Sequence, residues 1–201
     1  EEFKAVMEKL QSGLLTLDFE ERARTIHAEY HAGKITLPIL GKLFTIDRHC
    51  NVTTDIHVNS WVLGTVLHYL NYSQGMPLSS NWVPLRELPS GKDWYRLFGQ
   101  QCEQVLKATA DSYPDLFSDL VEAFRGRMVD ERFQADVSVI LSPLPLVPML
   151  ICYWHPEDGL ESSLNLFFDS TAEDHLEIEA LYALGTGMVR MFEKISHRHG
   201  M

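Results

Sequence analysis

A histidine and two acidic residues in the last third of the chain have side chains that suit acid/base chemistry. His155 and Glu157 directly follow a long apolar run, and an imidazole beside a carboxylate could exchange a proton with a substrate. Asp169 ends the next segment of alternating apolar residues. Because antiparallel neighbours run in opposite directions, the end of one strand lies beside the start of the previous one. We therefore expect Asp169 near Pro148 or Met149 rather than near His155.

The same three residues also have a structural explanation. A charged hairpin loop that keeps one end of a sheet in contact with water accounts for His155 and Glu157 without catalysis. A carboxylate at Asp169, directly before Ser170-Thr171, would stabilise the start of a helix. The sequence favours these structural roles and keeps an enzyme as an alternative.

Histidines and a cysteine in the first third of the chain are weak candidates for metal binding. His27 and His31 stand four residues apart in a segment whose spacing predicts a helix that stops at Gly33, and on a helix both imidazoles could reach one metal ion. Cys50 and His57 form another sulfur–nitrogen pair, but further ligands would have to come from elsewhere. We expect solvated histidines and ordinary loop residues here, and no metal site is favoured.

A long loop over residues 73–92 holds most of the residues that could line a ligand cleft. It contains three prolines and two glycines, and long loops that carry large aromatic residues tend to pack against the protein. The candidate cleft residues in and directly after this loop are Trp82, Arg86, Glu87, Trp94 and Tyr95. An arginine binds a carboxylate or phosphate through paired hydrogen bonds, and aromatic side chains form rigid walls. The alternative is an Arg86–Glu87 ion pair that pins the loop, with the tryptophans in the core.

The spacing of apolar residues predicts the elements that must position these side chains. A helical period marks residues 3–14, 19–30, 60–72, 94–106, 116–124 and 181–195. Alternation with period two marks a hairpin over residues 35–46 and three strands within residues 137–169. Helices and strands are segregated rather than alternating. We therefore expect an α+β fold, with an antiparallel sheet of about five strands packed against several helices.

We expect one domain over residues 1–201, in three parts. These are a helix-rich part over residues 1–126 with an early β-hairpin, a sheet-rich part over 135–169 and a C-terminal helix over 172–196. Within the hairpin, Pro38 indicates an edge strand, because proline lacks the N–H that a central strand donates. Gly185-Thr186-Gly187 starts like a dinucleotide-binding motif, but it lies inside the last helix instead of after a strand. Close helix packing or a kink in the helix is the better explanation of these glycines.

Charge and composition exclude several functional classes. Asp and Glu number 28 against 17 Lys and Arg, so the net charge of −11 disfavours nucleic acid and anionic membranes as partners. No apolar run reaches the roughly 20 residues of a membrane-spanning helix. The three cysteines are widely spaced, with no CxxC pair, which disfavours a zinc ribbon or a self-contained iron–sulfur site. The first residues, Glu1–Lys4, do not resemble a signal peptide, and we expect a cytoplasmic protein.

Several motifs resemble the signature of an uncharacterised bacterial and archaeal domain family. They are His68-Tyr69-Leu70, Gly75-Met76-Pro77-Leu78, the stretch from Trp82 to Pro89, Pro143-Leu144-Pro145, Trp154 and the stretch from Leu166 to Ser170. The resemblance spans about Leu17 to Ile195 and implies no assigned activity. Some members of that family are fused to an iron–sulfur-cluster domain, which implies anaerobic redox or one-carbon metabolism and a redox protein partner. The chain departs from the pattern in lacking a cluster-binding cysteine module and in the altered acidic run at 155–159.

The sequence thus predicts, first, a ligand-binding or accessory domain that takes a small anionic ligand in a cleft between helices and sheet. One alternative is a small enzyme, metal-assisted or acid/base, that uses His155 and its acidic neighbours. Another alternative is a protein-interaction module. Neither a cofactor nor an oligomeric state is indicated by the residues.

Overall fold

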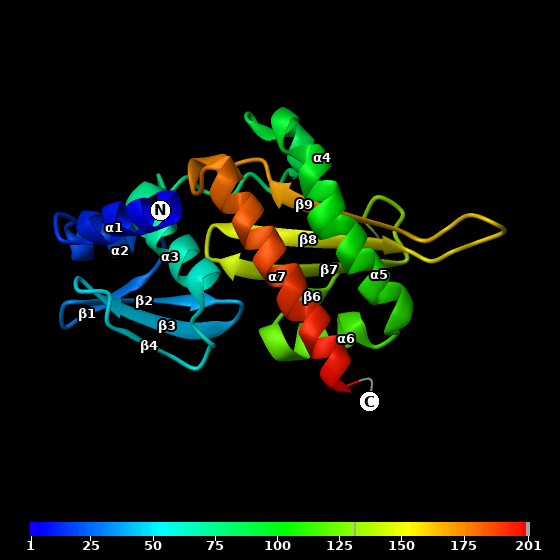
Figure 1. Ribbon diagram of the computed structural model, residues 1–201, viewed down its shortest axis with the longest axis horizontal. Helices are drawn as coiled ribbons and strands as arrows, with labels where there is room; N and C mark the ends of the chain where they lie inside the picture. Colours follow the sequence, from blue (N-terminus) through cyan, green and yellow to red (C-terminus); the bar gives the residue numbers. More distant parts are fainter. Residues whose placement is uncertain (131, 200–201) are drawn as a thin grey trace.

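The computed structural model describes residues 1–130 and 132–199, and it contains two antiparallel sheets and a set of helices (Figure 1). The helices are α1 (Glu2–Leu14), α2 (Phe19–Thr25), α3 (Ser60–Tyr72), α4 (Tyr95–Phe98), α5 (Gln104–Ser112), α6 (Leu116–Phe124) and α7 (Ile178–His199). Single turns of 3₁₀-helix are η1 (Leu85–Glu87), η2 (Gly91–Asp93) and η4 (Ala172–Asp174), and η3 (Gly99–Glu103) is a π-helical turn. The strands are β1 (Glu29–His31), β2 (Lys34–Ile39), β3 (Lys42–Asp47), β4 (Val52–Thr54), β5 (Trp82–Pro84), β6 (Arg127–Met128), β7 (Val137–Leu144), β8 (Val147–Trp154) and β9 (Ser163–Asp169). The expected α+β class is confirmed.

The first sheet has the strand order β1-β2-β3-β4 and is built around the expected hairpin. Ile39 pairs with Lys42 across a two-residue turn in which Leu40 and Gly41 both have positive φ, as a tight hairpin requires. Pro38 does not mark an edge strand, because β2 lies between β1 and β3. β1 pairs only with residues 34–36. No carbonyl of β1 therefore lies where it would need a hydrogen bond from an N–H at Pro38, and proline is tolerated there.

The helix expected over residues 19–30 is shorter than its spacing indicates, and that part of the prediction is wrong. α2 stops at Thr25, and His27 has a φ of 58° that ends the helix. Glu29–His31 then form the edge strand β1. The pattern misled because Tyr30, which continued the apparent apolar face, is exposed.

The second sheet has the order β5-β9-β8-β7-β6. Its centre is the expected meander, in which Ile151 of β8 lies opposite Val139 of β7 and Leu166 of β9. The five strands are not those anticipated, however. The early hairpin belongs to the other sheet, and the edges are supplied by β5, from within the long loop, and by the short β6.

Helices α5, α6 and α7 cover one face of the second sheet (Figure 1). A Cβ at Gly185 of α7 would lie 2.6 Å from the Phe98 ring, and one at Gly187 would overlap the ring of Trp61. Close packing at these two glycines is therefore confirmed. The opposite face carries a smaller apolar cluster that includes Phe167, and the exposed ring of Phe133 stacks on Phe167 with ring centroids 4.5 Å apart.

One buried apolar cluster extends across both sheets. It includes Ile35 and Leu37 of β2 together with Leu141 of β7 and Leu166 of β9. Backbone contact also joins the sheets, since the Leu40 N–H donates to the Ser142 carbonyl at 3.1 Å. None of the helices in residues 1–130 and 132–199 has the length and hydropathy needed to cross a bilayer.

Candidate functional site

Arg86 and Tyr95, two of the expected cleft residues, line one small cavity. Its volume is about 220 Å³, and its other lining residues are Pro84, Leu85, Phe98, Glu103, Asn165 and Phe167. Arg86 and Tyr95 come from η1 and α4, while Glu103 ends η3 and Asn165 belongs to β9. The cavity thus places a guanidinium, a phenol, a carboxyl and an amide around one apolar floor.

The long loop holds Arg86 in place because it is anchored at both ends of η1. On one side, β5 pairs with the last residues of β9, with Trp82 opposite Asp169. On the other side, a Cβ at Gly91 would overlap the carbonyl of Leu85. Only glycine allows the chain to fold back this closely against η1, so Arg86 projects from a fixed turn.

Glu103 is positioned by the π-helical turn that joins α4 to α5. One oxygen of its carboxyl group, Oε1, accepts hydrogen bonds from the Leu166 N–H at 2.9 Å and from Asn165 Nδ2 at 3.4 Å. Burial raises the pKa of Glu103, although these two hydrogen bonds and the charge of Arg86 act in the opposite direction. π-helical turns often occur at functional sites, and this one sets a partly buried carboxyl group against the edge of β9.

The remaining residues of the expected cleft lie elsewhere. Trp82 packs against the small apolar cluster on the far face of the sheet. Trp94 packs on Tyr182 of α7, with ring centroids 5.2 Å apart. Glu87 is exposed, and no ion pair between Arg86 and Glu87 occurs within the part of the chain that the structure describes. Both tryptophans are partly buried and pack against apolar clusters, and no Arg86–Glu87 ion pair holds the loop in the described residues.

Sequence reasoning missed Glu103 and Asn165. The apolar residues over 94–106 keep a helical spacing through the π turn, so the turn leaves no periodic signal. Asn165 is an exposed residue near the start of β9, between the buried residues Leu164 and Leu166. Only tertiary structure brings these two residues to Arg86.

A comparison with protein families matches residues 18–191 to a domain of unknown function, DUF3786. The chain belongs to the DUF3786 family. This agrees with the resemblance to an uncharacterised domain family, and every polar residue of the small cavity lies in the matched part of the chain. Comparison with curated proteins and with solved structures gives no match.

In this DUF3786 domain Asp169 has a structural role. Its side chain is 2% exposed, and it accepts hydrogen bonds from the N–H groups of Ser79, Ser80 and Thr171 and from the hydroxyls of Ser79 and Thr171. Burial would raise the pKa of Asp169, but hydrogen bonds from Thr171 and Ser79 outweigh it and the pKa is lowered. Asp169 lies next to Met149, whose partner is Phe168, as its place in the meander predicts.

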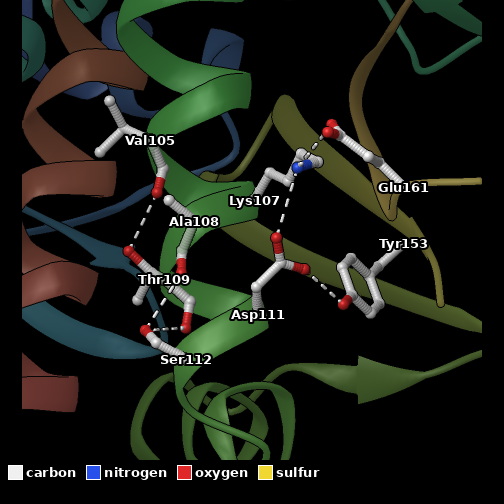
Figure 2. Close-up of polar contacts among 8 residues, drawn as sticks. All are labelled: Val105, Lys107, Ala108, Thr109, Asp111, Ser112, Tyr153 and Glu161. Atoms are coloured by element: carbon white, nitrogen blue, oxygen red, sulfur yellow. Dashed lines mark hydrogen bonds and ion pairs between the residues drawn. The ribbon is translucent and has the colours of Figure 1, made fainter. Parts of the chain in front are cut away.

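His155 lies at the other end of β8, roughly 20 Å from Asp169 by the rise of a strand. With Lys107, Asp111, Tyr153 and Glu161 it lines a second cavity of about 700 Å³, and Figure 2 shows the polar contacts among those four residues. There Lys107 Nζ lies 3.3 Å from Asp111 and 4.0 Å from Glu161, and the Tyr153 hydroxyl donates to Asp111 at 2.7 Å.

Each oxygen of the Asp111 carboxylate in the wall of this cavity already accepts a hydrogen bond from a neighbouring side chain. Burial would raise the pKa of Asp111, but hydrogen bonds from Ser162, Tyr153 and Lys107 outweigh it and lower the pKa. The backbone of Glu157 pairs with that of Leu160 in the exposed hairpin turn, and no ion pair joins Glu157 to His155 in the described part of the chain. The structure therefore does not gather the proposed acid/base residues, and the polar group clamps α5 to β8.

The candidate metal ligands of the DUF3786 domain are dispersed. His27 follows α2, His31 lies on β1, Cys50 lies in the turn after β3, and His57 precedes α3. Residues 1–130 and 132–199 contain no cluster of three or more His, Cys, Asp or Glu side chains that could hold a metal ion. The three cysteines are free thiols.

Proposed function

We propose that this domain binds a small organic acid in the cavity between Arg86 and Glu103. The observation that carries the proposal is that a cation and a carboxyl group line one cavity without forming an ion pair with each other in the described part of the chain. Opposite charges that are held apart in this way leave room for a ligand that binds both.

The chemistry of the two groups specifies the ligand. The Arg86 guanidinium suits a carboxylate, which it can bind through two hydrogen bonds. The Glu103 carboxyl group suits a hydroxyl on the same molecule, with Tyr95 and Asn165 at the sides. A volume of about 220 Å³ lies below that of cavities for drug-sized compounds, and it accommodates about ten non-hydrogen atoms or fewer. We therefore favour a small hydroxy acid.

The raised pKa of Glu103 gives the proposal a pH dependence. A carboxyl group with a raised pKa becomes neutral at a higher pH than an ordinary glutamate, and its repulsion of an anionic ligand then disappears. Binding of a hydroxy acid should tighten as the pH falls toward the pKa of Glu103. The variant Glu103→Gln should remove most of this dependence.

The test is a thermal-shift and calorimetric screen with glycolate, lactate and malate. We expect at least one acid to raise the melting temperature, and Arg86→Gln to weaken its binding at least tenfold. Arg127→Gln is the matched control, because Arg127 is an exposed arginine outside the cavity. The proposal is wrong if none of the acids binds with a Kd below 10 mM, which corresponds to a binding free energy of about 3 kcal/mol. It is also wrong if the Arg86→Gln variant binds the acid as tightly as the wild type does.

The resemblance to the uncharacterised domain family suggests a cellular compartment and a type of metabolism for this proposal. We place the domain in the cytoplasm as an accessory protein in anaerobic redox or one-carbon metabolism, acting beside a redox protein. Free thiols at Cys50, Cys102 and Cys152 support a reducing compartment. Co-purification from anaerobically grown cells, with recovery of a flavin or iron–sulfur protein, would test the setting.

A further inference from the structure

A third cavity lies between the start of α3 and the C-terminal half of α7, apart from the Arg86 cavity. Its volume is about 740 Å³, which is within the range of sites for cofactor-sized ligands. Its basic and aromatic lining residues are His57, Trp61, Arg190, Lys194 and Arg198. These are residues that the sequence patterns did not single out for binding, apart from His57.

Three cations lie on the side of α7 that faces this cavity. Arg190, Lys194 and Arg198 follow one another at intervals of four residues, which places them on one side of the helix. The rise of an α-helix spreads them over about 12 Å. None of the three forms an ion pair with a carboxylate in residues 1–130 or 132–199.

The charge of this cavity is opposite to that of the molecule. The lining residues that the structure describes include no aspartate and no glutamate, although the chain as a whole carries a net charge of −11. Three basic side chains held together without acidic partners repel each other, and an anionic ligand would relieve that repulsion. The first turn of α3, capped by Asn59 on the Val62 N–H at 3.1 Å, presents the positive end of its helix dipole on the same side.

An apolar wall accompanies the cations. Trp61 is half-buried, and its indole is fixed against Gly187, where a Cβ would overlap the ring. Ile56, Met191 and Ile195 extend this wall. A rigid indole beside a line of cations suits a ligand that has a flat ring as well as negative charge.

We propose that this cavity binds a phosphorylated compound with a flat ring, of the nucleotide type. Its phosphate groups lie along Arg190, Lys194 and Arg198, and its ring packs against Trp61. This site is independent of the small organic acid that we assign to Arg86, since the two cavities share no lining residue.

The test uses ATP, GTP and FMN as probes, measured by titration calorimetry. We expect at least one of them to bind with a Kd below 1 mM. Adenosine and tripolyphosphate, which each carry half of the recognised chemistry, should bind at least tenfold more weakly than ATP. The proposal is overturned if none of the three probes binds, or if tripolyphosphate binds as tightly as the best of them.

Matched variants locate the site. The double variant Arg190→Gln, Lys194→Gln should raise the Kd at least tenfold. The control is the double variant Lys42→Gln, Lys92→Gln, which removes the same charge from two exposed lysines elsewhere. It should change the Kd less than threefold. Trp61→Phe should weaken binding of the ring-bearing probe but not of tripolyphosphate. If the two double variants lose the same amount of affinity, the net charge of the protein explains the binding, and the proposed site is wrong. Arg86→Gln should leave nucleotide binding unchanged, which separates this test from that of the organic acid.

Discussion

At the scale of single residues, His175 shows how the loop after β9 is fixed to the core. Its side chain is 0% exposed, and Nδ1 shares a hydrogen bond of 2.8 Å with the hydroxyl of Ser73 at the end of α3. Burial lowers the pKa of His175, although the nearby charges of Asp174 and Asp169 act to raise it. The folded protein therefore favours the neutral imidazole.

This lowered pKa predicts that stability falls on mild acidification. The unfolded chain gains a proton on His175 near pH 6.5, whereas the folded chain gains it only at lower pH, so the free energy of unfolding decreases as the pH drops below about 6.5. His175→Gln cannot gain that proton and should reduce the decrease. Urea unfolding between pH 7.5 and pH 5 measures the effect.

The exposed histidine His31 gives the control for this prediction. His31→Gln should keep the wild-type dependence of stability on pH, because His31 lies on the exposed edge strand β1. An identical pH dependence in His175→Gln and the wild type would show that another group is responsible.

Residue roles were predictable from the sequence where they depend on strand order alone. The place of Asp169 beside Met149, and its separation from His155, follow from the direction of antiparallel strands. Glu103 could not be found in this way. Its contact with Leu166 joins residues 63 positions apart, and it depends on how α5 packs over β9.

At the scale of elements, the contact between α3 and α7 depends on glycine. Gly187 leaves the space that the Trp61 ring fills, whereas Gly64, also inside a helix, has Met7 Sδ as its nearest neighbour, 3.5 Å from the position of a Cβ. Gly187→Ala should therefore push the two helices apart and lower the free energy of unfolding by about 1–3 kcal/mol. Chemical denaturation followed by circular dichroism measures the change.

Gly64→Ala is the matched substitution in the partner helix α3. An alanine there meets only an ordinary contact, and its helix propensity should raise stability by about 0.5–1 kcal/mol. The two Gly→Ala substitutions should change the free energy of unfolding in opposite directions, which separates the effect of side-chain packing from that of helix propensity. If both variants gain stability, the close approach of α3 and α7 is wrong, and so is the fixed position of Trp61.

Elements with a strong hydrophobic period were the predictable part of the fold. α3, β8 and the hairpin of β2 and β3 lie where their spacing places them. The short elements were missed, because β1, β5 and β6 have three residues or fewer and are defined by pairing rather than by pattern. The π turn η3 is the most consequential omission, since it carries Glu103 into the small cavity.

At the scale of the whole molecule, two sheets share one core. Leu37 of β2 and Leu141 of β7 are both 0% exposed and belong to the same apolar cluster. Sequence patterns identified the hairpin and the meander but could not assign them to separate sheets, because both have the same period. The sharing of the core supports the single domain that we expect over the chain.

If the chain is a single domain, a destabilising substitution in the first sheet should also lower the stability of the second. Leu37→Ala removes buried methyl groups in β2 and should cost about 2–5 kcal/mol. Leu43→Ala on the neighbouring strand β3 is the control, because Leu43 is 68% exposed, and it should cost less than about 0.5 kcal/mol. Both substitutions are made in a Trp61→Phe, Trp94→Phe background, so that fluorescence comes only from Trp82 and Trp154 on the second sheet.

Cooperative folding requires that Leu37→Ala lower the urea midpoint of this fluorescence transition by as much as it lowers the midpoint seen by far-ultraviolet circular dichroism. Coincident shifts mean that the core joining β2 to β7 unfolds as one unit. An early circular dichroism transition, with the Trp82 and Trp154 signal unmoved, would instead mean that the two sheets fold independently. The cavity between α3 and α7 would then lie at the interface of two independently folding units, because α3 directly follows the first sheet in the chain and α7 covers the second (Figure 1).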